Sequence, residues 1–498
     1  GFLENDFVLC TALVDMYVEC GFLKKALDIL KEHHIKSTPC WNTLVIGCVK
    51  QGQDNEALNC LKIMQNEGLT MNETTLIWIL KACGGTGALD KGKEIHDMVV
   101  RTRLLEKYVA LGNVLMDMYI RCKEVAKAHE VLEQLPIRDA VSWNVIIAGY
   151  AQHEQCCGAV NCLEQMQSEG LSPDAVTFIC VLKACGRTGD ARKGKVIHDE
   201  IMRRGLLEKD IMLGTALATM YAKCDMLAKA HYVIQCLPER DIVSWNALIT
   251  GYTQQGECYE SLNCFEQLEN EGLFPDIVTF ICILKACGGI RAIEKGKQIH
   301  SKVMSRSLLE EDVMLGTALV DMYAKCGMFT KAKKLLQDLP IRNIICWNAL
   351  IAGYAKQGLG REALTCFEQM QGEGFSPDDI TFLCILTACS HSGLVEEGQV
   401  MFDGMHDVYQ LPPTLEHYAC MVDLLARAGQ LDTAILMIKE APFHPDKGIW
   451  LTVLGACRKW GNVELARHAF EHATLCHGYQ ASAYVCMLNV YANVGGSQ

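Results

Sequence analysis

The chain repeats itself with a fixed period of 102 residues. A Trp-Asn pair recurs at this spacing, with its tryptophan at Trp41, Trp143, Trp245 and Trp347. The same step separates Tyr17, Tyr119, Tyr221 and Tyr323, as well as His96, His198 and His300, and the Pro-Asp pairs at 173, 275 and 377. A strict internal period predicts an array of stacked units, because each unit buries its apolar face only against its neighbours.

Each unit divides into three similar segments, such as 242–276, 277–312 and 313–343. Each segment opens with apolar residues at i, i+3, i+4 and i+7, which is the pattern of an amphipathic helix. These residues are Trp245, Leu248, Ile249 and Tyr252, then Phe280, Ile283, Leu284 and Cys287, then Leu315, Ala318, Leu319 and Met322. A glycine-containing turn and a second striped helix follow, and no strand pattern competes. The sequence therefore predicts an all-α solenoid of helix-turn-helix repeats.

Charge and composition bound the function. The formal net charge of −13 argues against a nucleic-acid partner, because phosphate binding usually leaves a basic patch. That objection stays open, since a ligand responds to one groove and not to the whole surface. No run of eighteen apolar residues predicts a membrane-spanning helix, and no Pro- or Ser-rich linker divides the chain.

The 27 cysteines are an odd number, contain no CxxC pair and recur at the positions of the repeat. The recurring ones are Cys20, Cys122, Cys224 and Cys326, then Cys83, Cys185, Cys287 and Cys389, then Cys60, Cys162, Cys264 and Cys366. Disulfide frameworks belong to small secreted domains. The pattern instead predicts small buried apolar side chains in a reducing compartment.

Two short motifs resemble a nucleotide-binding site and a zinc site, but both belong to the repeat. Gly87, Gly92 and Lys93 match the start of a phosphate loop, but Glu94 follows and no strand precedes them. His198 and Glu200 form H-x-E without the downstream P-C-x-x-C of a zinc deaminase. We therefore predict no catalytic residue, no metal site, no cofactor and no small-molecule substrate.

The strings VSWNALITGYTQQG, PDIVTFICILKACGGI, GKQIHSKV and GTALVDMYAKCG resemble the P, L and S repeats of the pentatricopeptide-repeat family, in its PLS subclass. The resemblance implies a right-handed superhelix with an array over 7–414. S repeats then fall at 7–37, 109–139, 211–241 and 313–343, P repeats at 38–72, 140–174, 242–276 and 344–378, and L repeats at 73–108, 175–210, 277–312 and 379–414.

The ends of the chain resemble further parts of that family. Residues 1–6 look like the end of a truncated L repeat, and 415–446 like a variant final S repeat. Residues 447–480 resemble the first E motif, and 481–498 the truncated start of a second. The sequence is thus expected to be a fragment whose targeting peptide lies outside it.

The resemblance also implies which side chains contact RNA bases. In this family the fifth and last residues of a repeat contact one base edge. The fifth residues are Thr11, Asn42, Asn113, Asn144, Thr215, Asn246, Thr317 and Asn348, and their last-residue partners are Ser37, Asn72, Asp139, Asp174, Asp241, Asp276, Asn343 and Asp378. The second residues, which would pack on base faces, include Val8, Val141, Met212, Val243, Met314 and Ile345. The fifth-position asparagines of the P repeats are expected to line a shared inner groove; they are Asn42, Asn144, Asn246 and Asn348.

The family's pairing rule predicts a target of A, C, any, U, U, any, G, U, any, A, U from 5′ to 3′. The unread positions belong to L repeats, whose fifth residues Ile77, Ile179 and Ile281 cannot hydrogen-bond a base edge. A purely structural interpretation competes at the last position, because Asp, Asn and Ser are also preferred helix N-caps. L repeats end in Asp210 and Asp312 as well, so capping alone explains that position equally well.

Together these features imply a site-recognition factor for C-to-U RNA editing in a mitochondrion or chloroplast. Its partners would be single-stranded organellar RNA and, by resemblance, editing-complex proteins or a DYW deaminase domain acting in trans. The chain itself would be no enzyme and would contact no membrane. Two alternatives stay open: an RNA stability or processing factor, and a protein-binding scaffold, which the negative charge favours.

Overall fold

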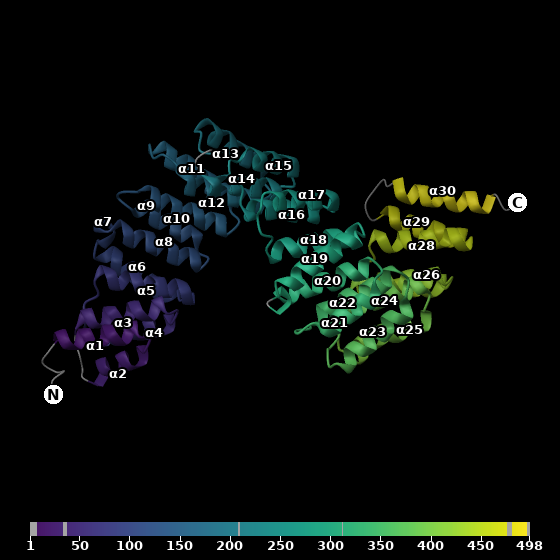
Figure 1. Cartoon of the computed structure of the whole chain (residues 1–498), viewed down its shortest axis with the longest axis horizontal. Coiled ribbons are helices and arrows are strands. Elements are labelled where there is room, and N and C mark those ends of the chain that lie inside the picture. Colours follow the sequence, from purple (N-terminus) through teal and green to yellow (C-terminus); the bar gives the residue numbers. More distant parts are fainter. Residues whose placement is uncertain (1–6, 33–36, 208–209, 311, 476–480, 496–498) are drawn as a thin grey trace. The chain divides into compact units, whose positions relative to one another are not determined.

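A computed structural model describes residues 7–32, 37–207, 210–310, 312–475 and 481–495. Over these ranges the secondary structure is helical throughout, which confirms the all-α prediction (Figure 1). Two compact units, residues 1–251 and 252–498, make up the chain. The proposed truncated L repeat at 1–6 lies outside the described residues. No described helix is long and apolar enough to cross a membrane.

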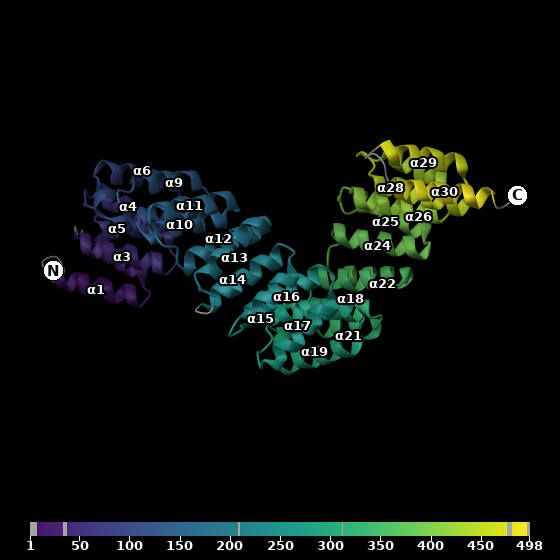
Figure 2. The ribbon, with the colours of Figure 1, turned by 90° about the horizontal axis from the view of Figure 1, so that it is seen from above.

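Helices alternate in pairs along the first unit, as the two views of the ribbon show (Figures 1 and 2). The pattern is a helix of 13 or 14 residues followed, after a short turn, by a second helix of 10 or 13. The helices are α1 Phe7–Glu19, α2 Leu23–Glu32, α3 Thr38–Lys50, α4 Asp54–Asn66, α5 Glu73–Thr86, α6 Leu89–Arg101, α7 Leu104–Lys107, α8 Val109–Arg121, α9 Val125–Gln134, α10 Ala140–Gln152, α11 Cys156–Ser168, α12 Ala175–Thr188, α13 Ala191–Arg203, α14 Ile211–Lys223 and α15 Leu227–Cys236.

The second unit continues the same alternation after α16, Ile242–Gln254, which spans the boundary between the units. Its elements are α17 Cys258–Asn270, α18 Ile277–Gly289, α19 Ile293–Ser305, the 3₁₀ turn η1 Leu308–Glu310, α20 Val313–Lys325, α21 Phe329–Asp338, α22 Ile344–Lys356, α23 Gly360–Gly372, α24 Asp379–Ser392, α25 Val395–Asp407, α26 Leu415–Arg427, α27 Leu431–Glu440, α28 Lys447–Trp460, α29 Val463–Leu475 and α30 Ala481–Gly495.

We call the leading helix of each pair a first helix and the other a second helix. First helices are α1, α3, α5, α8, α10, α12, α14, α16, α18, α20, α22, α24, α26 and α28. Within each unit, successive first helices pack on each other, as α12 does on α14 and α22 on α24. Each second helix packs on its own first helix and on the next one, as α11 does on α10 and α12. First helices therefore form one continuous layer in each unit, and second helices form the other.

Burial of the predicted apolar stripes creates this two-layer packing. Phe280, Ile283, Leu284 and Cys287 are fully buried, and the four periodic tryptophans keep at most 2% exposure. Burying such side chains contributes about 1.5–3 kcal/mol each. Glycines close the turns in the left-handed region, as Gly189 does after α12 with φ of 70°.

The cysteine prediction holds for two of its three sets. Those at the positions of Cys83 and Cys60 are buried, but Cys20 is exposed and Cys122, Cys224 and Cys326 are partly exposed. The latter three are C-cap residues of first helices, where the chain turns outward. No disulfide links the cysteines of the described ranges.

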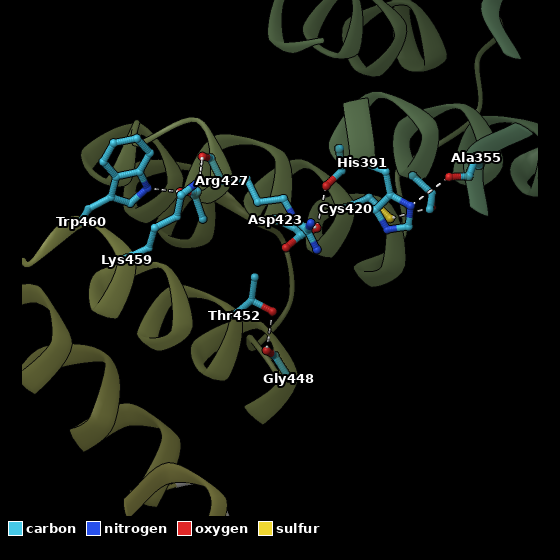
Figure 3. A network of polar contacts seen from close by, with 12 residues as sticks. Ala355, His391, Cys420, Asp423, Arg427, Gly448, Thr452, Lys459 and Trp460 are labelled. Atoms are coloured by element: carbon cyan, nitrogen blue, oxygen red, sulfur yellow. Dashed lines mark hydrogen bonds and ion pairs between the residues drawn. The ribbon is translucent and has the colours of Figure 1, made fainter. Parts of the chain in front are cut away.

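Side chains near the C-terminal ends of first helices also join neighbours. Trp460 donates from Nε1 to the Ala426 carbonyl at 3.0 Å, and Nδ1 of His391 lies 2.9 Å from the Ala355 carbonyl. Figure 3 shows Trp460, His391 and Ala355. Each carbonyl also accepts from a backbone N–H of the turn after its helix, Gly429 for Ala426 and Gly358 for Ala355, so the side chain adds a second bond to it. The layer of first helices is thereby fixed in register at this end within the second unit.

Candidate nucleic-acid interface

The fifth-position side chains lie between neighbouring first helices. Asn144 and Asn246 are partly exposed, whereas Asn42 and Asn348 keep only 8% and 5% exposure. Thr215 and Thr317 are similarly covered, at 5% and 8%. The expectation that the P-repeat asparagines line a shared inner groove is therefore wrong for Asn42 and Asn348, which are buried. A threonine of the next first helix contacts each of them, Thr75 for Asn42 and Thr381 for Asn348.

The structure brings the fifth and last residues of the same predicted repeat together. Asn144 Nδ2 lies 3.3 Å from Asp174 Oδ1, and Asn348 Nδ2 lies 3.0 Å from Asp378 Oδ1. The Thr215 hydroxyl lies 3.2 Å from Asp241 Oδ1. These contacts join positions 26 to 30 residues apart in sequence. Each pair presents adjacent polar atoms from two successive first helices.

The third residue of the following repeat fixes the orientation of the fifth. Thr177 donates to Asn144 Oδ1 at 2.7 Å, and Thr381 donates to Asn348 Oδ1 at 2.8 Å. Thr75 contacts Asn42 in the same way. Because the amide oxygens of Asn144 and Asn348 face a buried threonine, their amide nitrogens face the aspartate. Sequence analysis did not single out these threonines, although the same spacing of 33 residues relates all three pairs.

The last residues are N-caps, as the structural interpretation predicts. Side-chain oxygens of Asn72, Asp139, Asp174, Asp276, Asn343 and Asp378 accept from backbone N–H groups in the first turn of the next helix. Asp241 accepts from Ser244 N at 2.8 Å, whereas Ser37 makes no side-chain cap bond. Asp210 and Asp312 cap their helices too. Capping thus accounts for the residue type at this position without excluding a second role.

The carboxylate of Asp378 uses one oxygen for all this local bonding, whereas Asn144 Nδ2 lies within 3.4 Å of both oxygens of Asp174. Oδ1 of Asp378 accepts from Thr381 N, the Thr381 hydroxyl and Asn348, which leaves Oδ2 available to a ligand. Partial burial raises the pKa of the Asp378 carboxyl, but the bonds from Thr381 and Asn348 outweigh it and lower the pKa below its ordinary value. Asp174 has a lowered pKa from the same set of effects. Both groups are anionic acceptors at neutral pH.

The remaining predicted positions are arranged differently. The Thr317 hydroxyl bonds to the Val313 carbonyl at 2.9 Å and contacts Cys346 Sγ, whereas Asn343 caps α22. Thr11 contacts Cys40 Sγ at 3.2 Å. Oδ1 of Asn113 is buried without a hydrogen-bond partner among the described residues. The side chain of Val8 lies outside what the structure describes.

Second-position side chains form a row of exposed apolar groups on the first helices. Val141, Met212, Val243, Met314 and Ile345 are 47–64% exposed. Sequence analysis left out the same position of three predicted L repeats, where Val176, Val278 and Ile380 are 51–58% exposed. Second helices carry apolar side chains that are as exposed, such as Val196 at 63%, so what distinguishes these residues is their shared position in the repeat. Val176, Val278 and Ile380 could have been predicted from the sequence, because each is the second residue of its repeat.

Charge is divided unevenly between the two layers. From α3 to α22 the first helices carry nine basic and three acidic residues, although the whole chain is at −13. The basic residues are Lys50, Lys81, Arg121, Lys183, Arg187, Lys223, Lys285, Lys325 and Lys356, and the acidic ones are Glu73, Asp117 and Asp321. These helices are therefore net basic along their lengths, and their basic residues lie in the C-terminal halves, whereas N-cap carboxylates such as Asp139, Asp174 and Asp276 stand at their N-termini.

The two decoy motifs have structural roles. Gly87 is the left-handed C-cap of α5, and Lys93 lies within α6 opposite Asp90 at 3.6 Å. His198 Nδ1 lies 2.9 Å from the Tyr221 hydroxyl, and Glu200 pairs with Arg203 and Arg204. No group of three metal-ligating side chains suited to an ion occurs in the described parts of the chain.

Comparison with known proteins places this architecture in a family. The model of the PPR repeat family matches residues 138–187, 240–289 and 342–391, and that of the PPR repeat matches 8–32, 39–69, 176–206, 317–344 and 380–408. A mitochondrial pentatricopeptide repeat-containing protein of Arabidopsis thaliana is 33% identical over 98% of this chain, which spans 71% of that relative. The chain belongs to the pentatricopeptide repeat family.

Other pentatricopeptide repeat proteins of Arabidopsis thaliana match to a similar degree. One is 34% identical over 99% of the chain, and a chloroplastic one is 34% identical over 98%. The chain spans 59% and 60% of their lengths. Among solved structures, the pentatricopeptide repeat protein PPR10 in complex with an 18-nt psaJ RNA element is similar with a TM-score of 0.67 at 15% identity, covering 98% of this chain and 78% of that one. This likeness confirms the helical-repeat fold.

Proposed function

We propose that the chain binds single-stranded RNA in a sequence-specific manner, with one base read by each predicted P or S repeat. The observation that carries the proposal is the contact between the fifth and last residues of a repeat, seen at Asn144–Asp174, Thr215–Asp241 and Asn348–Asp378. Capping needs no polar partner at the fifth position, since capping bonds go to the backbone. A base edge, in contrast, needs adjacent donors and acceptors, which such a pair supplies.

The chemistry of each pair supports discrimination among bases. An asparagine amide has two N–H groups, so a bond to aspartate leaves one for a base acceptor. Oδ2 of the aspartate accepts from a base donor, such as the imino N–H of uracil. A threonine in place of asparagine offers a single hydroxyl and changes that pattern. The row of apolar second residues supports the proposal further, because it gives base faces a surface on which to pack.

The finer role that we propose is site recognition for C-to-U editing of organellar RNA. Support comes from the likeness of 415–480 to the variant S repeat and E motif, and from relatives named as mitochondrial and chloroplastic. The chain would choose the site, and a DYW deaminase domain, supplied in trans or by another part of the full protein, would perform the chemistry. Binding of PPR10 to an 18-nt psaJ RNA element supports single-stranded RNA as the ligand.

A gel-shift titration tests the proposal directly. The probe carries ACNUUNGUNAU, and the competitor has the same composition in scrambled order. We expect the probe to bind at least about tenfold more tightly, which is about 1.4 kcal/mol. Equal affinity for both would overturn one-base-per-repeat reading. Binding to neither would overturn RNA recognition altogether and favour the protein-binding scaffold that the net charge of −13 supports.

A further inference from the structure

Three lysines occupy the same place in the first helices of successive predicted L repeats. They are Lys81 in α5, Lys183 in α12 and Lys285 in α18, each the ninth residue of its repeat and each exposed. None makes an ion pair with any described residue. Two second-helix lysines differ in this respect, since Lys91 and Lys297 bond to glutamates three residues away at 2.6 Å.

Helix geometry places these lysines on the face that holds the candidate base-contacting positions. With 3.6 residues per turn, the ninth residue lies within about 20° of the second and about 40° of the fifth. It stands about 6 Å along the axis from the fifth residue. Because helical side chains lean toward the N-terminus, each lysine extends back over the preceding turn, where Lys81 Nζ lies 4.3 Å from the centre of the Trp78 ring. Val176 and Ile179 thus share one face of α12 with Lys183.

The repeats that carry these lysines are those that lack a polar fifth residue. Ile77, Ile179 and Ile281 stand there, partly exposed, and none can hydrogen-bond a base edge. A nucleotide passing such a repeat still carries a phosphate. An ammonium group that has no carboxylate partner among the described residues suits that phosphate as a point charge.

We infer that Lys81, Lys183 and Lys285 bind backbone phosphates of the RNA, so that the predicted L repeats anchor the strand without selecting a base. This inference rests on the proposed function and adds a role for the repeats that the pairing rule leaves silent. One such anchor would occur for every three nucleotides. Phosphate contacts of this kind fix position and carry no sequence information.

Phosphate binding is best supported where α12 packs on α14. Neither helix contains an acidic residue, and Lys223 of α14 is exposed there with Thr219, not aspartate, one turn before it. In the two equivalent helices, Arg121 and Lys325 are held by Asp117 and Asp321 at 2.8 and 2.7 Å. We therefore expect Lys183 to contribute most to anchoring.

The test compares two triple variants by salt titration of RNA affinity. One is Lys81→Gln, Lys183→Gln and Lys285→Gln. The control is Lys62→Gln, Lys195→Gln and Lys334→Gln, which removes the same charge from exposed positions on α4, α13 and α21. Each phosphate contact to a single strand contributes about 0.7 to the slope of log K against log salt. The first variant should therefore lower the slope by about 2, whereas its preference for ACNUUNGUNAU over the scrambled probe stays unchanged.

A second measurement locates the contact. The modified probe has neutral methylphosphonate linkages on both sides of its sixth nucleotide. Wild type should bind it more weakly than the unmodified probe. The Lys183→Gln variant should bind the two probes equally well. The phosphate assignment would be overturned if the triple variant of Lys81, Lys183 and Lys285 changed the salt slope only as much as the control does, or if it lost its base preference. RNA binding by wild type would be unaffected by either result. Failure of wild type to prefer the probe would instead overturn the proposed function and the inference with it.

Discussion

Asn348 on α22 donates from Nδ2 to Oδ1 of Asp378, the N-cap of α24, at 3.0 Å. Thr381 in the first turn of α24 donates to the other end of the same amide at 2.8 Å. The asparagine is thus held between two groups of the following helix, with its nitrogen toward the carboxylate. This arrangement makes the pair a rigid unit, so the identity of either residue should decide what a base edge meets.

Changing the last residue of this pair should change the base that is preferred. In Asp378→Asn an amide, which also donates, replaces a carboxylate that only accepts. By the pairing rule, preference at the eleventh nucleotide should move from U to C, with a change in discrimination of about 1–3 kcal/mol. The measurement is competition binding with the four bases at that nucleotide.

Asp312→Asn provides the matched control. Asp312 caps α20 through the N–H groups of Met314 and Leu315, but it ends a predicted L repeat. Asparagine caps helices about as well as aspartate, so neither variant should lose much stability. If the control shifted base preference as much as Asp378→Asn, the decoding role of Asp378 would be refuted and capping would suffice.

The exposed second-position row should matter for RNA and not for folding. Val141 and Val176 are 58% and 55% exposed, so their replacement by serine removes little buried surface. Stacking of a base on an aromatic side chain contributes about 1–3 kcal/mol. Valine is smaller and not aromatic, so we expect the double variant Val141→Ser with Val176→Ser to weaken RNA binding by less than this amount for each base. The melting temperature should hardly move. Val196→Ser changes a second-helix valine that is 63% exposed, and an equal loss of affinity there would contradict the assignment.

Two equivalent tryptophans should differ in how well they tolerate phenylalanine. Trp143 donates from Nε1 to Glu169 Oε2 at 3.2 Å, whereas Nε1 of Trp347 is buried with no partner among the described residues. Both rings are at most 2% exposed, so the apolar loss is alike. Trp143→Phe should therefore lower the free energy of unfolding by about 1 kcal/mol more than Trp347→Phe. Urea denaturation measures the difference, and equal costs would show that the Glu169 bond contributes nothing.

The repeat period and apolar stripes were enough to predict the helices and the core. Trp245, Phe280 and Leu315 are buried because an apolar stripe at helical spacing packs against the neighbouring helices of a stacked array. Burial of Asn42 and Asn348 could not be predicted in this way, since it depends on how closely the following helix approaches. The partnership of Thr381 with Asn348 spans two helices, so no local pattern records it. Cys224 was predicted to be buried but is partly exposed. It is the C-cap residue of α14, and in the sequence a C-cap cysteine at the end of an apolar stripe looks like a core residue.

Three histidine–tyrosine pairs should make stability depend on pH. His96, His198 and His300 each place Nδ1 2.9 Å from a tyrosine hydroxyl, on Tyr119, Tyr221 and Tyr323. Burial lowers the pKa of each imidazole below its ordinary value of 6.5. For His198, Asp199 acts in the opposite direction and raises the pKa, whereas Lys229 lowers it further. The folded chain therefore keeps these rings neutral at a pH where the unfolded chain has begun to protonate them.

The sign follows from proton linkage. Because the unfolded state binds more protons as pH falls through 6.5, the free energy of unfolding should decrease from pH 7.5 toward pH 5 and level off only below the folded pKa. A variant with His96→Gln, His198→Gln and His300→Gln should be less stable at pH 7.5 but show a flatter dependence. His406→Gln changes an exposed histidine and should retain the wild-type slope. Thermal melts at both pH values distinguish these outcomes, and a triple variant as steep as wild type would show that the paired histidines are not the groups that titrate.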